Sequence, residues 1–146
     1  MRRPFLWINF VLSSLIVLLI FLQAYLITAY VTGAGEDALD AHGFVGFLFI
    51  HGFELLVFLT AFGAWPRQWK WIGFTFFLFA LGTVQIFLAP PDEDPASGWV
   101  HGLHGLLALF VMVTAAIIAH RGMRDLGLRG GRRDELAGAD TPLPPP

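Results

Sequence analysis

The sequence predicts an all-α integral membrane protein, a four-helix bundle whose spans run alternately up and down. Of the 146 residues, 56% are hydrophobic and 14% are charged, too little charge to cover the surface of a soluble domain of this size. Four apolar segments are each long enough to cross a hydrocarbon core, which takes roughly 20 helical residues. All nine Lys and Arg residues lie on one side of these segments. Together these three observations predict the fold class.

The four spans are predicted at residues 5–31, 41–65, 71–89 and 99–120, within a single domain over residues 1–120. Turn and breaker residues separate them: Gly33-Ala34-Gly35, then Trp65-Pro66, then Pro90-Pro91 with Pro95 and Gly98. The segments lack the two-residue alternation of membrane strands, which argues against a barrel. The first segment is about twice as long as the apolar region of a cleaved signal peptide, so we expect it to remain as a span.

Charge placement predicts the orientation of the spans. Basic residues stand before the first span, between the second and third, and after the fourth, whereas the other two loops carry only acids. By the positive-inside rule, both termini lie in the cytoplasm. Tryptophans stand at the span ends, where an indole suits the membrane interface: Trp7, Trp65, Trp69, Trp71 and Trp99.

The segment after the fourth span, residues 121–146, is rich in arginine and glycine and then in proline. It is predicted to be a disordered basic cytoplasmic tail, because it cannot bury a core. The net charge of −2, with no basic patch outside the cytoplasmic segments, argues against a nucleic-acid partner. The absence of cysteine excludes disulfides, iron–sulfur clusters and thiolate metal sites, which leaves histidine as the strong nitrogen ligand for a metal or haem.

Four of the five histidines lie in the outer halves of spans 2 and 4: His42, His51, His101 and His104. His101 and His104 are three residues apart and share a helix face. His42 and His51 are nine apart, hence about 180° opposed on an α-helix, so they cannot both point at one centre. Counted in residues from the cytoplasmic arginines, His51 lies at the same depth as His104. Counted from the outer ends of the spans, His42 lies at the same depth as His101 and His104. The pairing therefore stays open. His120 is expected to be an interfacial basic residue.

Helical phase assigns the other polar groups. The face of His42 is predicted to point inward, and its further members are Gly46, Phe49, Phe53, Leu56, Thr60 and Gly63. The opposite face, with His51, is predicted to meet lipid. Glu54 lies near that second face, where it is expected to be protonated or paired with His51. Gln23 and Gln85 lie in the outer halves of spans 1 and 3, where interhelical hydrogen bonds are expected. We find no internal sequence repeat, although spans 2 and 4 both begin with an outer His-Gly.

Histidines on facing helices predict a bis-histidine haem b, which needs two neutral imidazoles, an apolar aromatic pocket and glycines beside the macrocycle. Each outer histidine is followed by glycine: Gly43, Gly52, Gly102 and Gly105. A copper or zinc site is the metal alternative, with His101 and His104 joined by His42 and by Asp40 or Glu54. A non-catalytic accessory or structural membrane protein is the other alternative. No nucleophile elbow, P-loop or His-Glu-x-x-His motif indicates an enzyme.

The stretches around two histidines carry a resemblance. At Asp40-Ala41-His42-Gly43-Phe44-Val45-Gly46 and Trp99-Val100-His101-Gly102-Leu103-His104-Gly105, the chain resembles an uncharacterised family of small four-span bacterial membrane proteins. The resemblance implies a glutamine late in span 1 (Gln23) and histidines opening span 2 (His42) and span 4 (His101). It implies a bacterial inner-membrane location and no known activity. The layout is also similar to that of four-helix b-type cytochrome membrane subunits.

The leading hypothesis is a haem b protein that passes electrons near the outer surface, within the lipid bilayer. His42 with His101 or His104 would be the axial ligands, and His51 with Glu54 would relay protons. Expected partners are a quinone or a respiratory membrane complex, or a second copy of the chain.

Overall fold

The structure is a computed structural model that describes residues 2–89 and 97–128. In these two ranges the chain is helical and contains no strand. Its elements are the helices α1 (Arg2–Ala29), α2 (Glu36–Phe44), α3 (Gly52–Ala64), α4 (Trp69–Phe87) and α5 (Ser97–Asp125), with the π-helical segments η1 (Tyr30–Ala34) and η2 (Val45–His51). α2, η2 and α3 follow one another without a break. Four helical stretches are long and apolar enough to cross a membrane, as predicted.

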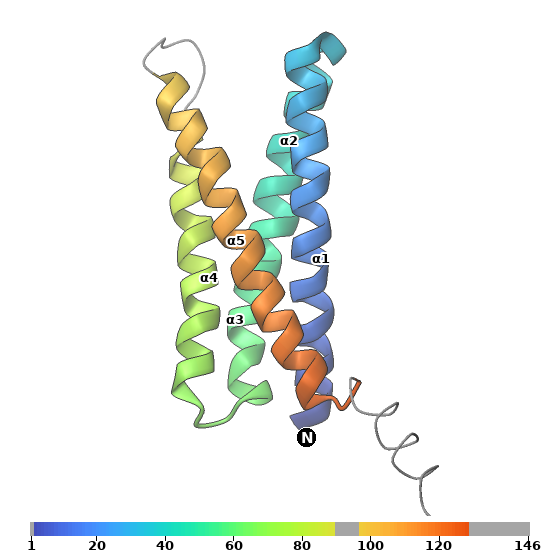
Figure 1. Cartoon of the computed structure of the whole chain (residues 1–146), viewed down its shortest axis with the longest axis vertical. Helices are drawn as coiled ribbons and strands as arrows, with labels where there is room; N and C mark the ends of the chain where they lie inside the picture. Colours follow the sequence, from blue (N-terminus) through green and yellow to red (C-terminus); the bar gives the residue numbers. More distant parts are fainter. Residues whose placement is uncertain (1, 90–96, 129–146) are drawn as a thin grey trace, which may run out of the picture.

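The four helical stretches lie side by side, and successive ones run in opposite directions (Figure 1). α1 packs against α3 and α5, and α4 also packs against α3 and α5. α5 crosses the molecule obliquely, from beside α4 at one end to beside α1 at the other (Figure 1). Among the described residues, no Cα atom of α5 comes within 8 Å of α2, η2 or α3. Any link between α2 and α5 therefore depends on side chains.

The first two predicted turns are confirmed. Gly33 and Gly35 have φ angles of 100° and 91°, which side chains rarely tolerate, and the chain reverses there. α3 ends at Ala64, directly before Trp65-Pro66, and the next helix begins at Trp69. The third connection, with Pro90, Pro91 and Pro95, lies outside the described residues, as does most of the predicted tail, 129–146.

The π-helical segment η2 changes the phase of the second span. The expectation that His42 and His51 oppose each other assumed α-helix throughout. One π turn takes up an extra residue, which removes about 100° from the angle between them. Glu54 then comes within about 20° of the His42 direction. The buried positions of this span are Ile50, Glu54, Val57, Ala61 and Ala64. The predicted interior positions Phe49 and Leu56 are instead exposed, so that part of the phase prediction is wrong.

The interior contains polar side chains from the first and third spans. Asn9, Ser13 and Thr75 are fully buried, and Gln23 is nearly so. The Asn9 Nδ2 donates to the Val57 carbonyl at 2.8 Å and to the Thr60 hydroxyl at 2.9 Å, which joins α1 to α3. Each such bond within a membrane protein is worth about 0.6 kcal/mol on average.

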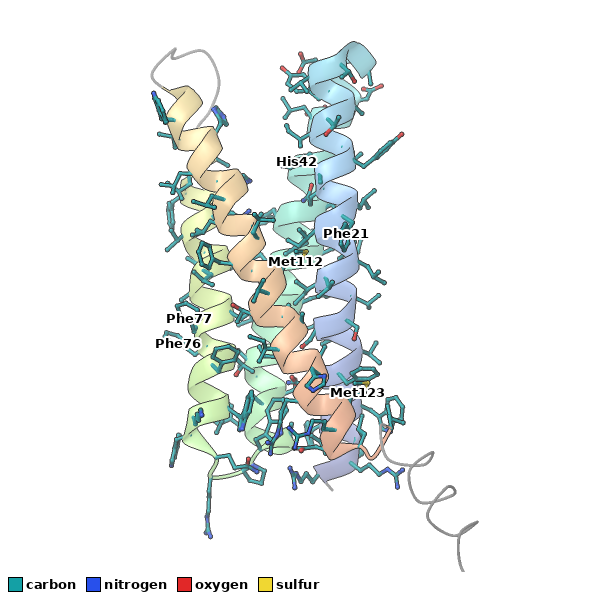
Figure 2. All side chains as sticks on the ribbon, viewed as in Figure 1. Phe21, His42, Phe76, Phe77, Met112 and Met123 are labelled. Carbon is teal, nitrogen blue, oxygen red and sulfur yellow. The ribbon has the colours of Figure 1, made fainter. Side chains whose placement is uncertain are left out.

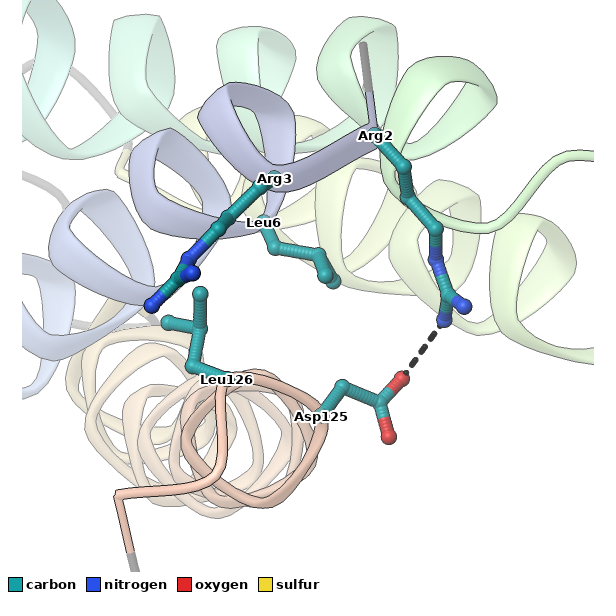
Figure 3. Close-up of a pocket in the computed structure, with 5 residues that line it drawn as sticks. All are labelled: Arg2, Arg3, Leu6, Asp125 and Leu126. Carbon is teal, nitrogen blue, oxygen red and sulfur yellow. Dashed lines mark hydrogen bonds and ion pairs between the residues drawn. The ribbon is translucent and has the colours of Figure 1, made fainter.

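An ion-pair cluster closes the end of the molecule that carries the chain's start (Figure 3). α5 continues beyond the predicted span end at His120, to Asp125. The Asp125 carboxylate accepts from the Arg2 guanidinium at 3.0 Å, from the Trp65 indole at 2.8 Å and from Arg121 at 3.2 Å. Trp65 is 0% exposed, so the prediction that it meets the membrane interface is wrong. The Trp65 indole instead links the end of α3 to α5 through its hydrogen bond to Asp125.

Candidate functional site

His42 is held on α2 by the neighbouring helix α1. Its Nδ1 lies 3.3 Å from the Gln23 carbonyl oxygen, and the Gln23 side-chain amide donates to the His42 carbonyl at 2.9 Å. A Cβ atom on Gly46 would lie 2.7 Å from the Gln23 amide nitrogen, so glycine leaves the room that this glutamine uses. Figure 2 shows His42 in the upper half of the molecule, toward the α1–α2 turn.

His104 is held on α5 in the same way by α4. Its Nδ1 lies 3.0 Å from the Gln85 carbonyl oxygen. Each histidine is therefore tied to the backbone of the preceding antiparallel helix, at a glutamine in the predicted outer half. The sequence singled out both glutamines for their side chains, whereas the contact to each histidine ring comes from the backbone carbonyl of the glutamine.

The structure brings His42 and His104 together. Their ring centroids are 6.2 Å apart, with the ring planes inclined by 52°. Of the two pairings that the sequence left open for His42, the structure contains the one with His104. His101 lies one turn nearer the start of α5, at an exposed position.

The hydrogen bonds fix the tautomer of both imidazoles. A carbonyl oxygen only accepts, so Nδ1 must carry the hydrogen and donate it in each case. The lone pair then resides on Nε2, which is the tautomer of a metal-ligating histidine oriented by a carbonyl. Within the described part of the chain, neither Nε2 atom has a hydrogen-bond partner of its own.

A second polar group lies on α3 and its preceding π turn. The His51 Nδ1 is 3.1 Å from the Glu54 carboxylate, which confirms the predicted pair. The His51 ring stacks on Phe79 of α4, with centroids 4.9 Å apart. The predicted relay residues therefore form a group of their own, and His51 is paired with Glu54 rather than with His104.

The described residues do not gather three or more His, Asp or Glu side chains around a common point. The predicted copper or zinc set of His101, His104 and His42 with Asp40 or Glu54 is thus not assembled. What the structure does assemble is a pair of imidazoles. Two neutral Nε2 donors on different helices suit a metal that needs only two protein ligands on opposite sides, as haem iron does.

The two halves of the candidate site are equivalent in sequence. Gln23 and His42 are 19 residues apart, and so are Gln85 and His104. The second pair follows the first by 62 residues (85 − 23 and 104 − 42). Other fully buried positions share this offset: Ser13 with Thr75, and Ile16 with Leu78. The pattern Gln-x18-His-Gly, present twice, extends the likeness between spans 2 and 4, which both begin with an outer His-Gly.

No family model matches this chain, and no curated protein and no solved structure matches it. The resemblance to small four-span bacterial membrane proteins stays an expectation.

Proposed function

We propose that the chain is a four-span haem b protein of a bacterial inner membrane, with His42 and His104 as the axial ligands. The observation that carries this proposal is the pair of imidazoles whose rings lie next to each other. They come from two different helical hairpins, and each is oriented by a backbone carbonyl so that Nε2 is the ligating atom.

The separation of the two rings fits the proposed cofactor. Two imidazoles that held one iron through bonds of about 2 Å would have ring centroids roughly 6 Å apart. The centroids of His42 and His104 are 6.2 Å apart. The α2 and α5 backbones stay more than 8 Å from each other, so the rings approach without close backbone packing.

Small residues flank both ligands. Gly43 and Gly105 directly follow the two histidines, and a Cβ atom at either glycine would meet nothing within 4 Å. Both glycines lie at exposed positions, so this space is on the outer surface of the helices. When bound, haem supplies reversible one-electron exchange, and the chain's own part is to orient the imidazoles and surround them with apolar helices.

The outward surface supports insertion in a membrane. Leu18, Phe21, Phe47 and Phe110 are each more than half exposed, and such a continuous apolar surface needs an apolar medium. Phe76 and Phe77 likewise project from the outer side of α4 (Figure 2). The basic residues cluster at the end opposite the histidine pair, which supports cytoplasmic termini and a cofactor near the outer surface. Suitable electron partners there are a quinone or a respiratory membrane complex.

The test is a dithionite-reduced minus oxidised absorbance spectrum of the protein purified in mild detergent after expression with ample haem. The full-length chain is expected to give sharp α and β bands. His42→Ala and His104→Ala are each expected to lose most of the haem, whereas His101→Ala, the matched control on the same helix face as His104, is expected to keep it.

Because an alanine variant can fail to fold, His42→Met and His104→Met are measured as well. Methionine remains an iron ligand, so both are expected to shift the spectrum rather than abolish it. A flat spectrum of the unmodified protein, or bands unchanged in both alanine variants, would contradict the proposal.

The second candidate is a non-catalytic accessory membrane protein. The observation in its favour is that both imidazoles already have backbone acceptors, which link the helices without any cofactor. Stoichiometric co-purification of other membrane subunits with a flat spectrum would favour it.

A further inference from the structure

Glu54 is a fully buried acid in the middle of the second span. Its side chain is 0% exposed, and within the described residues its Oε2 atom contacts the His51 Nδ1 while its Oε1 atom has no hydrogen-bond partner. An acid at membrane depth is costly, and such groups usually serve a function. Structural hydrogen bonding does not account for Glu54, because one of its two oxygens is left unused.

The helix opposite is shaped to receive this acid. A Cβ atom on Gly82 of α4 would coincide with the Glu54 carboxyl group. One turn earlier on α4, Phe79 stacks on the His51 ring. α4 thus provides a space for the carboxyl group and an apolar wall for the imidazole, and both members of the pair are positioned by the same helix.

We propose that His51 and Glu54 form a membrane-embedded proton-binding site, in which the protonated Glu54 carboxyl group donates a hydrogen bond to the His51 Nδ1. Without an added proton, a neutral imidazole and a carboxylate would together hold one uncompensated negative charge inside an apolar interior, which is strongly unfavourable. A single bound proton makes the pair neutral. Protonation of the carboxyl also avoids separating two charges across 3.1 Å of low-dielectric space.

The ligand is a proton rather than a metal cation. A hard cation such as Ca²⁺ binds about six or more oxygen ligands in its protein sites. Here the carboxyl group of Glu54 is the one acid present, and the described residues form no group of three or more potential metal ligands. A proton needs only the donor and acceptor that the structure supplies.

Among the described residues, no other acid or base competes at this depth. The helices packed against α3 are α1 and α4. In α1 no ionisable residue lies between Arg3 and Tyr25, and α4 carries only Lys70, at its cytoplasmic end. On the second span itself, His42 is bonded to Gln23 on α1.

Proton exchange is expected to pass through His51. Its side chain is 21% exposed, whereas that of Glu54 is closed off completely. An imidazole can accept a proton at one ring nitrogen and release one at the other, which makes it a suitable intermediary. His51 is thus the member of the pair through which a proton would reach or leave the carboxyl group.

The experiment is infrared spectroscopy of the full-length protein in detergent, in H2O and in D2O. The carbonyl stretch of a protonated carboxylic acid is separate from the amide bands and shifts in D2O. The protein is expected to show such a band at neutral pH, and Glu54→Gln is expected to lose it. Glu36→Gln is the matched control, because Glu36 is an exposed acid on the same span, and it is expected to keep the band.

Glu54→Asp keeps a carboxyl group and is expected to retain the band at a shifted position. This variant tests the proposal even if Glu54→Gln folds poorly. The absence of a D2O-sensitive band, or a band unchanged in Glu54→Gln, would overturn the proposal. So would loss of the band on adding sodium at constant pH, which would indicate a cation site. The measurement needs no haem, so its outcome is independent of the function proposed above.

Discussion

At the scale of single residues, Gly82 governs how closely α4 approaches the second span. The Glu54 carboxyl group occupies the volume that a Cβ atom would take. Thr75 and Leu78, on the same face of α4, are fully buried, so this face has no free space nearby. A larger residue at position 82 must therefore displace the acid or push the helices apart.

Gly82→Ala is expected to lower the free energy of unfolding by about 1–3 kcal/mol, the usual cost of adding a group to a filled interior. Gly73→Ala on the same helix is the matched control, since a Cβ atom there would meet nothing within 4 Å. It is expected to be neutral or slightly stabilising, because alanine favours helix over glycine by up to about 1 kcal/mol. Thermal unfolding in detergent, followed by circular dichroism, measures both. Equal melting temperatures would contradict the packing argument.

The polar residues of the candidate site could be selected from the sequence, because histidine, glutamine and glutamate at membrane depth are conspicuous. The pair His51 and Glu54 could be predicted as well, because three residues on one helix bring two side chains together. The role of Gly82 could not, since a glycine gives no sign of what a distant segment places beside it. Nor could the contact of Asp125 with Trp65, which depends on α5 extending past the span.

At the scale of elements, the π turn η2 decides which faces of the second span point inward. With α-helix throughout, His42 and Glu54 would diverge by about 120°. The extra residue in η2 reduces this angle to about 20°. The inward side of the span then carries both residues, with His42 next to α1 and α5 and Glu54 next to α4. π turns carry no clear compositional signature. The four spans could therefore be located from apolar length and breakers, while the direction of the histidines within the second span could not.

Deletion of Leu48, an exposed residue within η2, is expected to restore α-helix and rotate His42 by about 100° relative to Glu54. Because the chain has no cysteine, spin labels can be attached to Gly43→Cys and Gly105→Cys, where added side chains meet no neighbour. Electron–electron double resonance is expected to give a narrow distance distribution in the parent protein and a displaced one after the deletion. Deleting Ala38, which precedes His42, leaves the phase between His42 and Glu54 intact and serves as the control. An unchanged distribution after loss of Leu48 would mean that the π turn does not set the geometry.

At the scale of the whole molecule, two hairpins of related sequence contribute unequally. The histidine pair is nearly symmetric, because each hairpin supplies one imidazole held by a glutamine carbonyl 19 residues earlier. The acid site breaks this symmetry. At the offset of 62 residues, Glu54 corresponds to Ala116 and Gly82 corresponds to Ile20. The two hairpins thus contribute matched residues to the histidine pair, whereas the acid is present in the first hairpin and has no counterpart at the matched position of the second.

The orientation of the whole molecule determines which compartment the histidine pair serves. The basic residues and the Asp125 cluster mark the opposite end, so the α1–α2 turn is expected to face outward. In spheroplasts of a bacterial host, Asp37→Cys is expected to react with a membrane-impermeant maleimide. Trp69→Cys, at a highly exposed position that carries no charge, is expected to react only after permeabilisation. The reverse pattern would put His42 and His104 near the cytoplasmic face, where an electron partner would be reached from the cytoplasm, and would contradict the assignment made from the arginines.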